Sequence, residues 1–141
     1  MPEKYATSAP VLAMIANHLV NASEYEKAEG VIKKGLAIDE NNANLNFQMA
    51  SRYFFEAIVN QDQQDALMKS KEGSYSERAE KINELKAAQK PMLEAAHEWS
   101  EKVYKLNPND AQNNVMLSQI KAKLLLPIPE ELKAKVDSYR Q

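Results

Sequence analysis

The sequence predicts an all-α fold of about six helices that pack as antiparallel pairs, with an elongated middle pair. The 141 residues include only three glycines, and residue types that favour helix are abundant. Apolar residues recur at steps of three and four over long stretches, as on one face of a helix. Two similar polar segments, AIDENNA at 37–43 and KLNPNDA at 105–111, end helical runs in the same way. This length suits a single domain over 1–141.

The first two helices are expected at 9–21 and at about 24–38. Ser8 can cap the amino end of the first helix, and Pro10 suits its first turn, where a missing N–H costs nothing. Ser23 is expected to cap the second helix, because acidic residues follow it in the first turn. Two helices joined by so short a loop are predicted to pack antiparallel.

The middle pair is the long one. A third helix is expected to begin near Ala43, and the segment 71–74 contains the only strong turn signal before the next helix, at 76–106. Pro91 either kinks that helix or lies in the first turn of a new one. The fourth helix carries a seam with a period of about 3.5 residues, with Gln89 in its one polar slot. Its apolar members are Ile82, Leu85, Met92, Ala96, Trp99, Val103 and Leu106.

Two shorter helices complete the chain. The fifth is predicted at about 110–126 with Asp110 as its cap, and the proline-containing segment 127–129 ends it. A last helix is expected from Pro129 to about Tyr139, because proline followed by acidic residues is typical of a helix start. This helix is strongly polar, as expected of a helix that covers the end of a repeat array.

The two similar turns reveal an internal repeat. Overlaying 36–43 on 104–111 gives an offset equal to two periods of about 34 residues each. Helix–turn–helix units with that period are typical of the tetratricopeptide repeat (TPR), and the stretch 9–42 resembles one whole repeat. The positions that carry this resemblance are Ala16, Tyr25, Ala28, Gly35, Asn41 and Asn42, whereas Glu40 replaces the usual proline. Partial matches lie at 43–56, 93–110 and 111–141. The resemblance implies a TPR-like α-solenoid.

The segment 43–110 is longer than one repeat by a whole period. One interpretation lengthens both helices of the second repeat into a projecting hairpin, whose arms would overhang by about 25 Å. The other divides the segment into two degenerate repeats, 43–76 and 77–110, and requires a turn near 60–62. The unbroken seam favours the hairpin. Several bacterial TPR proteins look similar, with a long insert before an LNPND turn.

Composition excludes several classes of function. A formal net charge of −2 leaves no basic surplus for nucleic acid, and no apolar run is long enough to span a membrane. The absence of cysteine rules out disulfides and thiolate metal sites. The first ten residues lack the pattern of a signal peptide. The chain as written therefore suits the cytoplasm, while an excised mature fragment could equally be exported or periplasmic, so the compartment stays open.

The residues for catalysis or metal binding are few. Glu94-x-x-His97 has the spacing of a di-iron ligand pair, but His18 has no glutamate three residues before it to complete a second pair. The chain lacks a glycine-rich phosphate loop, a Gly-x-Ser-x-Gly elbow and a cysteine nucleophile. We therefore expect neither an enzyme nor a resident cofactor or metal.

The resemblance to TPR proteins implies binding of a protein or peptide in a concave groove lined by the first helix of each pair. By position, the groove residues would be Ala13, Asn17, Phe47, Gln48, Ser51, Val115, Met116 and Gln119. Of the residues with which some TPR domains hold a C-terminal carboxylate, only Asn17 is in place. The crowding of aromatic residues near Tyr53 predicts that Phe47 or Phe55 faces the groove or a partner. A groove of amides and apolar groups suits an extended or amphipathic segment.

The alternative function is self-association, in which the projecting hairpin or a terminal face pairs with a second copy. The polar last helix has one narrow apolar stripe, at Leu132, Val136 and Tyr139, and looks like a solubilising cap. A monomer is therefore favoured, and a homodimer is the alternative.

Overall fold

The computed structural model describes residues 8–140, so most of the segment examined for a signal peptide lies outside the described residues. Within them the chain forms six α-helices and no β-strand, which confirms the all-α prediction. The helices are α2 (Ala9–Asn21), α3 (Tyr25–Ile38), α4 (Ala43–Lys69), α5 (Tyr75–Leu106), α6 (Ala111–Lys123) and α7 (Glu130–Ser138).

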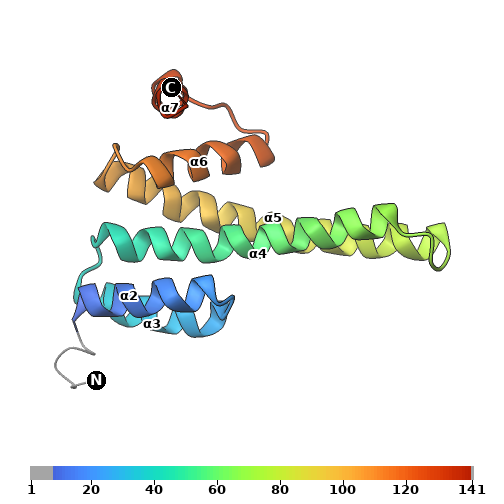
Figure 1. The fold of residues 1–141 in the computed structure, drawn as a ribbon, viewed down its shortest axis with the longest axis horizontal. Helices are drawn as coiled ribbons and strands as arrows, with labels where there is room; N and C mark the ends of the chain where they lie inside the picture. Colours follow the sequence, from blue (N-terminus) through green and yellow to red (C-terminus); the bar gives the residue numbers. More distant parts are fainter. Residues whose placement is uncertain (1–7, 141) are drawn as a thin grey trace.

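Helices α4 and α5 form the centre of the molecule and run alongside each other in opposite directions (Figure 1). Helices α2 and α3 pack together and against α4, while α6 packs on α5 and α7 packs on α6. These four shorter helices surround only one end of the long pair, so the other end projects as a two-helix arm (Figure 1). The molecule thus has a base to which all six helices contribute and a projecting arm of two.

Four of the helices begin with the same side-chain cap, and three of these caps, at the starts of α2, α4 and α6, follow the sequence repeat. The side chains of Ser8, Asn42 and Asp110 accept hydrogen bonds from the backbone N–H three residues later, at 3.4, 2.9 and 3.0 Å. The first two caps are separated by one period of the sequence repeat, and the second and third by two periods. The predicted caps at Ser8 and Asp110 are confirmed.

The predicted cap at Ser23 is wrong. Ser23 has a left-handed backbone, with φ of 62°, and Glu24 takes the cap position of α3 without a side-chain hydrogen bond. Ser23 instead ends α2, where the Glu24 N–H donates to the Leu19 carbonyl at 2.9 Å in a Schellman motif. Leu125 (φ 58°) ends α6 through the same motif, three repeat periods further along the chain. Because of this motif, α6 ends at Lys123, before the predicted boundary.

The two similar turns also share their hydrogen bonds. The Asn41 N–H donates to Asp39 Oδ1, and the Asn109 N–H donates to Asn107 Oδ1, both at 3.2 Å. One carbonyl in each turn accepts two further side-chain bonds: from Asn46 and Lys102 to Glu40, and from Asn114 and Lys135 to Pro108. Sequences that differ at several positions therefore build the same turn.

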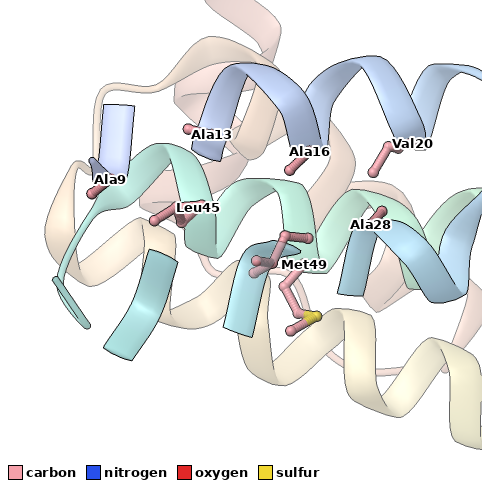
Figure 2. Packing of buried hydrophobic residues seen from close by; sticks show 8 residues of the cluster. Ala9, Ala13, Ala16, Val20, Ala28, Leu45 and Met49 are labelled. Carbon is pink, nitrogen blue, oxygen red and sulfur yellow. The ribbon is translucent and has the colours of Figure 1, made fainter. Parts of the chain in front are cut away.

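Small residues allow the helices of the base to approach closely. Ala16 of α2, Ala28 of α3 and Ala50 of α4 are fully buried, and Figure 2 shows Ala16 and Ala28 between neighbouring helices. The closest approach is at Gly35 of α3, because a Cβ atom there would lie 2.6 Å from Cδ1 of Leu45 in α4. The missing side chain of Gly35 thus makes room for a leucine from the next helix.

The predicted seam of α5 packs well only in the base. Ala96 and Val103 are buried, with Leu93 and Ser100 beside them, whereas Leu106 is exposed at the end of the helix. The other seam residues are half-buried. Leu106 was predicted to belong to the apolar seam, but it lies in the last turn of α5 and is exposed. The helical period of the sequence does not show how far the neighbouring helices extend, so it did not predict this exposure.

The buried side chains of the arm are carboxamides. From 58 to 92 the only buried side chains are those of Asn60 and Gln64, which join Gln61 and Gln89 in one hydrogen-bonded cluster. Gln89 also donates to the Ala57 carbonyl at 3.0 Å across the pair. Helix α4 continues through 60–62, where the two-repeat interpretation needs a turn, and α5 continues through Pro91 as one helix.

Candidate functional site

A groove of about 780 Å³ crosses helices α2, α4 and α6. Its floor contains Phe54 and Met116, which belong to a buried cluster between α4, α5 and α6. Tyr139, just after α7, lines the groove as well, and its hydroxyl lies 3.0 Å from Asn114 Nδ2. The described residues that line it are Asn17, Val20, Asn21, Phe47, Gln48, Ser51, Phe54, Phe55, Ala111, Gln112, Val115, Met116, Gln119 and Tyr139.

The structure brings seven of the eight predicted groove residues to this one surface: Asn17, Phe47, Gln48, Ser51, Val115, Met116 and Gln119. The exception is Ala13, which is 1% exposed and packs in the core between the first helices. Ala13 only borders an adjoining depression of about 500 Å³, which shares Asn17, Phe47 and Gln48 with the groove. The prediction for Ala13 is therefore corrected, because its position on α2 turns it towards the core of the base.

Sequence reasoning missed several lining residues. Both Phe47 and Phe55 line the groove, although only one of them was expected there. Tyr139 was assigned to the apolar stripe of the last helix, yet it is 40% exposed and reaches the groove. Its amphipathic side chain, after the last helical turn, is the one signal that marks it in the sequence. Gln112 takes part because it stands in the first turn of α6, beside the amino end of α4.

Carboxamides supply most of the polar groups of the groove. Gln48 is only 5% exposed, and its Nε2 donates to Oδ1 of Asn17 and to Oδ1 of Asn44, both at 3.2 Å. These two bonds use both protons of the Gln48 amide. The Ser51 hydroxyl donates weakly to the sulfur of Met116 at 3.9 Å, which joins α4 to α6 under the groove. Gln48 and Ser51 are thus held in place by bonds that reach neighbouring helices.

The groove carries no formal charge. None of its described lining residues is a lysine, arginine, histidine, aspartate or glutamate. Among the described residues that line the adjoining depression, Asp110 carries a charge, and its carboxylate caps α6. A charged ligand group would therefore lose hydration here without gaining an opposite charge.

Two clusters of charged groups lie elsewhere in the base. On α4, Arg52 is buried, bonds Glu56 at 2.7 Å and lies 4.0 Å above the ring of Tyr53. The Tyr53 hydroxyl donates to Oε1 of Glu29 at 2.6 Å, so the cluster joins α3 to α4. Burial, followed by this hydrogen bond to a carboxylate, raises the pKa of Tyr53 above its usual value.

The second cluster contains the histidine of the Glu94-x-x-His97 pair. His97 Nε2 lies 3.3 Å from Oε1 of Glu101, and that oxygen accepts a hydrogen bond of 2.6 Å from Lys121 of α6. His97 thus faces Glu101, one turn later, together with a lysine. Within residues 8–140 no three His, Cys, Asp or Glu side chains are grouped as metal ligands would be.

No helix of the described residues is both long and apolar enough to cross a lipid bilayer. Comparison of the chain with protein-family models, with curated proteins and with solved structures gave no match.

Proposed function

We propose that the chain is a TPR-like module that binds another protein through the groove across α2, α4 and α6, without catalysis of its own. The observation that carries the proposal is the convergence of apolar and amide side chains from three helices on the lining of one groove. Phe47 and Phe55 offer apolar area above the buried Phe54 and Met116, while carboxamides offer donors and acceptors around it. Such a mixture fits a polypeptide, whose main chain is polar and whose side chains are partly apolar.

The repeat pattern supports the proposal independently of the groove. Equivalent caps, turns and Schellman motifs recur at whole multiples of the repeat period, and α2, α4 and α6 all begin on that period. An α-solenoid of TPR-like pairs would place the first helix of each pair on the concave side. The groove lies on those three helices. In this proposal the segment 43–110 is one repeat whose two helices are elongated into a projecting hairpin.

Affinity capture tests the groove. The immobilised protein is used to capture partners from a lysate of the source organism, and the Phe47→Ala variant is expected to lose them. Phe47 is half-buried, so the fold of this variant is checked by circular dichroism. Met68→Ala is the matched control, because Met68 is a large apolar residue that is 70% exposed on the arm. Loss of the same partners with Met68→Ala, and not with Phe47→Ala, would contradict the proposal.

Self-association through the arm is the second candidate. Leu67, Ile82 and Leu85 are only half-buried, and Met68 and Tyr75 are largely exposed, so the arm could bury more apolar surface against a second hairpin. Light scattering at two concentrations decides between the candidates. We expect the mass of one chain, 15.9 kDa, at both. A mass that doubles and returns to one chain in a Met68→Asp/Tyr75→Asp variant would favour the second candidate.

A further inference from the structure

An apolar depression of about 320 Å³ lies on the arm, between α4 and α5 near the turn that joins them. Leu67 of α4 and Ile82 of α5 line it and are only half-buried. Met68 and Tyr75 also line it and are 70% and 80% exposed. Every described lining residue belongs to α4 or α5, so this apolar area has no cover from the other described helices. The arm thus leaves open the position that a third helix takes in a bundle.

Two cations border this depression without an anionic partner. Arg78 and Lys86 line it, and none of its described lining residues is an aspartate or a glutamate. The Arg78 guanidinium donates to the carbonyls of Glu72 and Gly73, at 2.8 and 2.7 Å, but forms no ion pair within residues 8–140. Lys86 makes no side-chain bond in the same part of the chain. Their spacing in the sequence places the two cations about 12 Å apart along α5, so each is a separate partner for an acidic side chain.

A second depression on α5 carries the opposite charge. It measures about 630 Å³, and its described lining includes Glu80 and Glu84 but no lysine, arginine or histidine. Neither carboxylate forms an ion pair with another described residue. Tyr75, Ala79 and Asn83 line both depressions, and residues at this spacing of four form one ridge on a helix. The ridge therefore has cations along one side and carboxylates along the other.

We propose that the arm binds an amphipathic helix of a partner protein, which lies along this ridge. Acidic side chains on one edge of the helix pair with the two cations of the arm, and basic side chains on its other edge pair with Glu80 and Glu84. The surface is separate from the groove, so the inference goes beyond the proposed function and does not rest on it. A helix suits the site better than an extended segment, because its main-chain groups are bonded internally and need no partner from the arm. Its side chains supply an apolar stripe between two charged edges.

A second copy of the chain fits the ridge less well. Antiparallel pairing of two α5 helices about a twofold axis would bring the cationic side of one ridge against the cationic side of the other, and the two acidic sides would meet likewise. Like charges in such contact destabilise the pair. Parallel pairing of two copies would match the charges, and a measurement of molecular mass separates that case from a partner helix.

Selection from a helix library tests the class of partner. Phage display a three-helix scaffold protein in which the outer face of one helix is randomised, and clones that also bind the Tyr75→Asp variant are discarded. Enriched helices are expected to carry acidic residues along one edge of an apolar stripe and lysine or arginine along the other. Enriched helices whose two edges are both acidic, both basic or both uncharged would overturn the inference.

A charge exchange tests the assigned pairs. One enriched helix is titrated calorimetrically against wild type and Lys86→Glu, together with derivatives in which each acidic residue of the helix is replaced in turn by lysine. Lys86→Glu is expected to weaken the original helix by about 3- to 10-fold, because a pair of opposite charges becomes a pair of like charges. One lysine derivative should bind Lys86→Glu to within about twofold of the original complex, which identifies the residue that meets Lys86. Glu84→Lys tests the other edge in the same way, with lysine-to-glutamate derivatives.

The matched control is Lys33→Glu, which makes the same change of charge at an exposed position of α3. Circular dichroism verifies that the helix content of each variant is retained, as expected because Lys86 and Glu84 are both exposed. Equal weakening by Lys33→Glu and Lys86→Glu would contradict the assigned pairs, since it would report net charge alone.

Two further measurements separate the other occupants and the other surface. A wild-type mass of two chains in light scattering that returns to one chain in Lys86→Glu would assign the ridge to a second copy and overturn the inference. The Phe47→Ala variant should bind the enriched helix as wild type does. Loss of that binding would place the helix in the groove, which refutes the inference and leaves the proposed function standing.

Discussion

At the scale of single residues, equivalent positions make equivalent bonds even where the residue types differ. Ser23 and Leu125 both adopt the left-handed conformation that favours glycine, and both end a helix by the same pair of backbone bonds. For a residue with a Cβ that conformation costs about 1 kcal/mol or more. The backbone hydrogen bonds of the Schellman motif therefore outweigh the conformational preference of serine and of leucine. Serine is also a common helix cap, and for that reason the sequence suggested a cap at Ser23.

Gly35 and Gly30 occupy the same helix in opposite surroundings. Gly35→Ala is expected to lower the free energy of unfolding by about 1–3 kcal/mol, because the new methyl group would overlap the buried Leu45 side chain. Gly30→Ala should raise it by about 0.5–1 kcal/mol, since no atom lies within 4 Å of a Cβ there and alanine favours helix. Urea denaturation followed by circular dichroism measures both. An equal gain from the two substitutions would mean that Leu45 moves aside freely.

Tyr53 makes stability depend on pH in the alkaline range. Its pKa is raised in the folded protein by burial and by the bond to Glu29, so the folded state holds the phenolic proton more tightly than the unfolded state. This contribution is complete below the unfolded pKa of about 10 and is lost as pH rises through the higher folded pKa. Urea denaturation from pH 8 to 11 should show wild type losing stability relative to Tyr53→Phe. A constant difference would refute the linkage.

At the scale of elements, the long pair consists of two parts with different interiors. In the base, α5 contributes buried Leu93, Ala96 and Val103, and helices α2, α3 and α6 pack against the pair. In the arm, the buried positions are carboxamides, and no third helix is present. Amide networks fix the register of two helices well, because a slip leaves donors and acceptors unpaired. They contribute less apolar burial, so the arm should open before the base does.

Gln89 is the residue on which this difference can be tested. Gln89→Ala removes its bonds to the Ala57 carbonyl, to Gln61 and to Gln64, and should cost about 1–2 kcal/mol in the arm. Hydrogen exchange followed by mass spectrometry should become faster in 60–88 and stay unchanged in 93–103. Lys90→Ala is the control, as Lys90 is exposed and makes no side-chain bond in the described part of the chain. Uniform acceleration over both ranges would show that arm and base unfold together.

At the scale of the whole molecule, the groove depends on the base alone. Its lining residues come from α2, from the first half of α4, from α6 and from Tyr139, all outside the arm. The central helix pair holds α2 and α3 on one side and α6 and α7 on the other (Figure 1). The distance across the groove is therefore set by helices packed in the base.

Replacing residues 62–87 by a short Gly-Ser turn should leave the base folded. Gln64 is the only buried side chain in that range, so little of the core is removed. We expect the melting temperature to stay within about 5 °C of wild type and the affinity for a groove peptide to be unchanged. Thermal denaturation and calorimetry measure the two quantities. Loss of cooperative unfolding would instead show that the base needs the arm.

Local rules predicted much of this structure, and the errors other than the Ser23 cap and the end of α6 share a cause. The helices and the caps at Ser8 and Asp110 follow from periodicity and from short-range hydrogen bonding, both visible in the sequence. The exposure of Leu106 and the burial of Ala13 depend on where neighbouring helices begin and end. The part played by Tyr139 in the groove depends on the path of the chain after Pro129. These features are set by packing between elements, which one sequence does not display.

The turn at 70–74 gives the molecule a natural attachment point for a reporter. The chain contains no cysteine, so a single thiol introduced by Lys71→Cys would be unique. Lys71 is exposed in the connection between α4 and α5, and this connection lies at the end of the arm, away from the shorter helices (Figure 1). A fluorophore there would lie about 25 Å beyond the base. Energy transfer between this fluorophore and Trp99, the only tryptophan of the sequence, would report movement of the arm relative to the base.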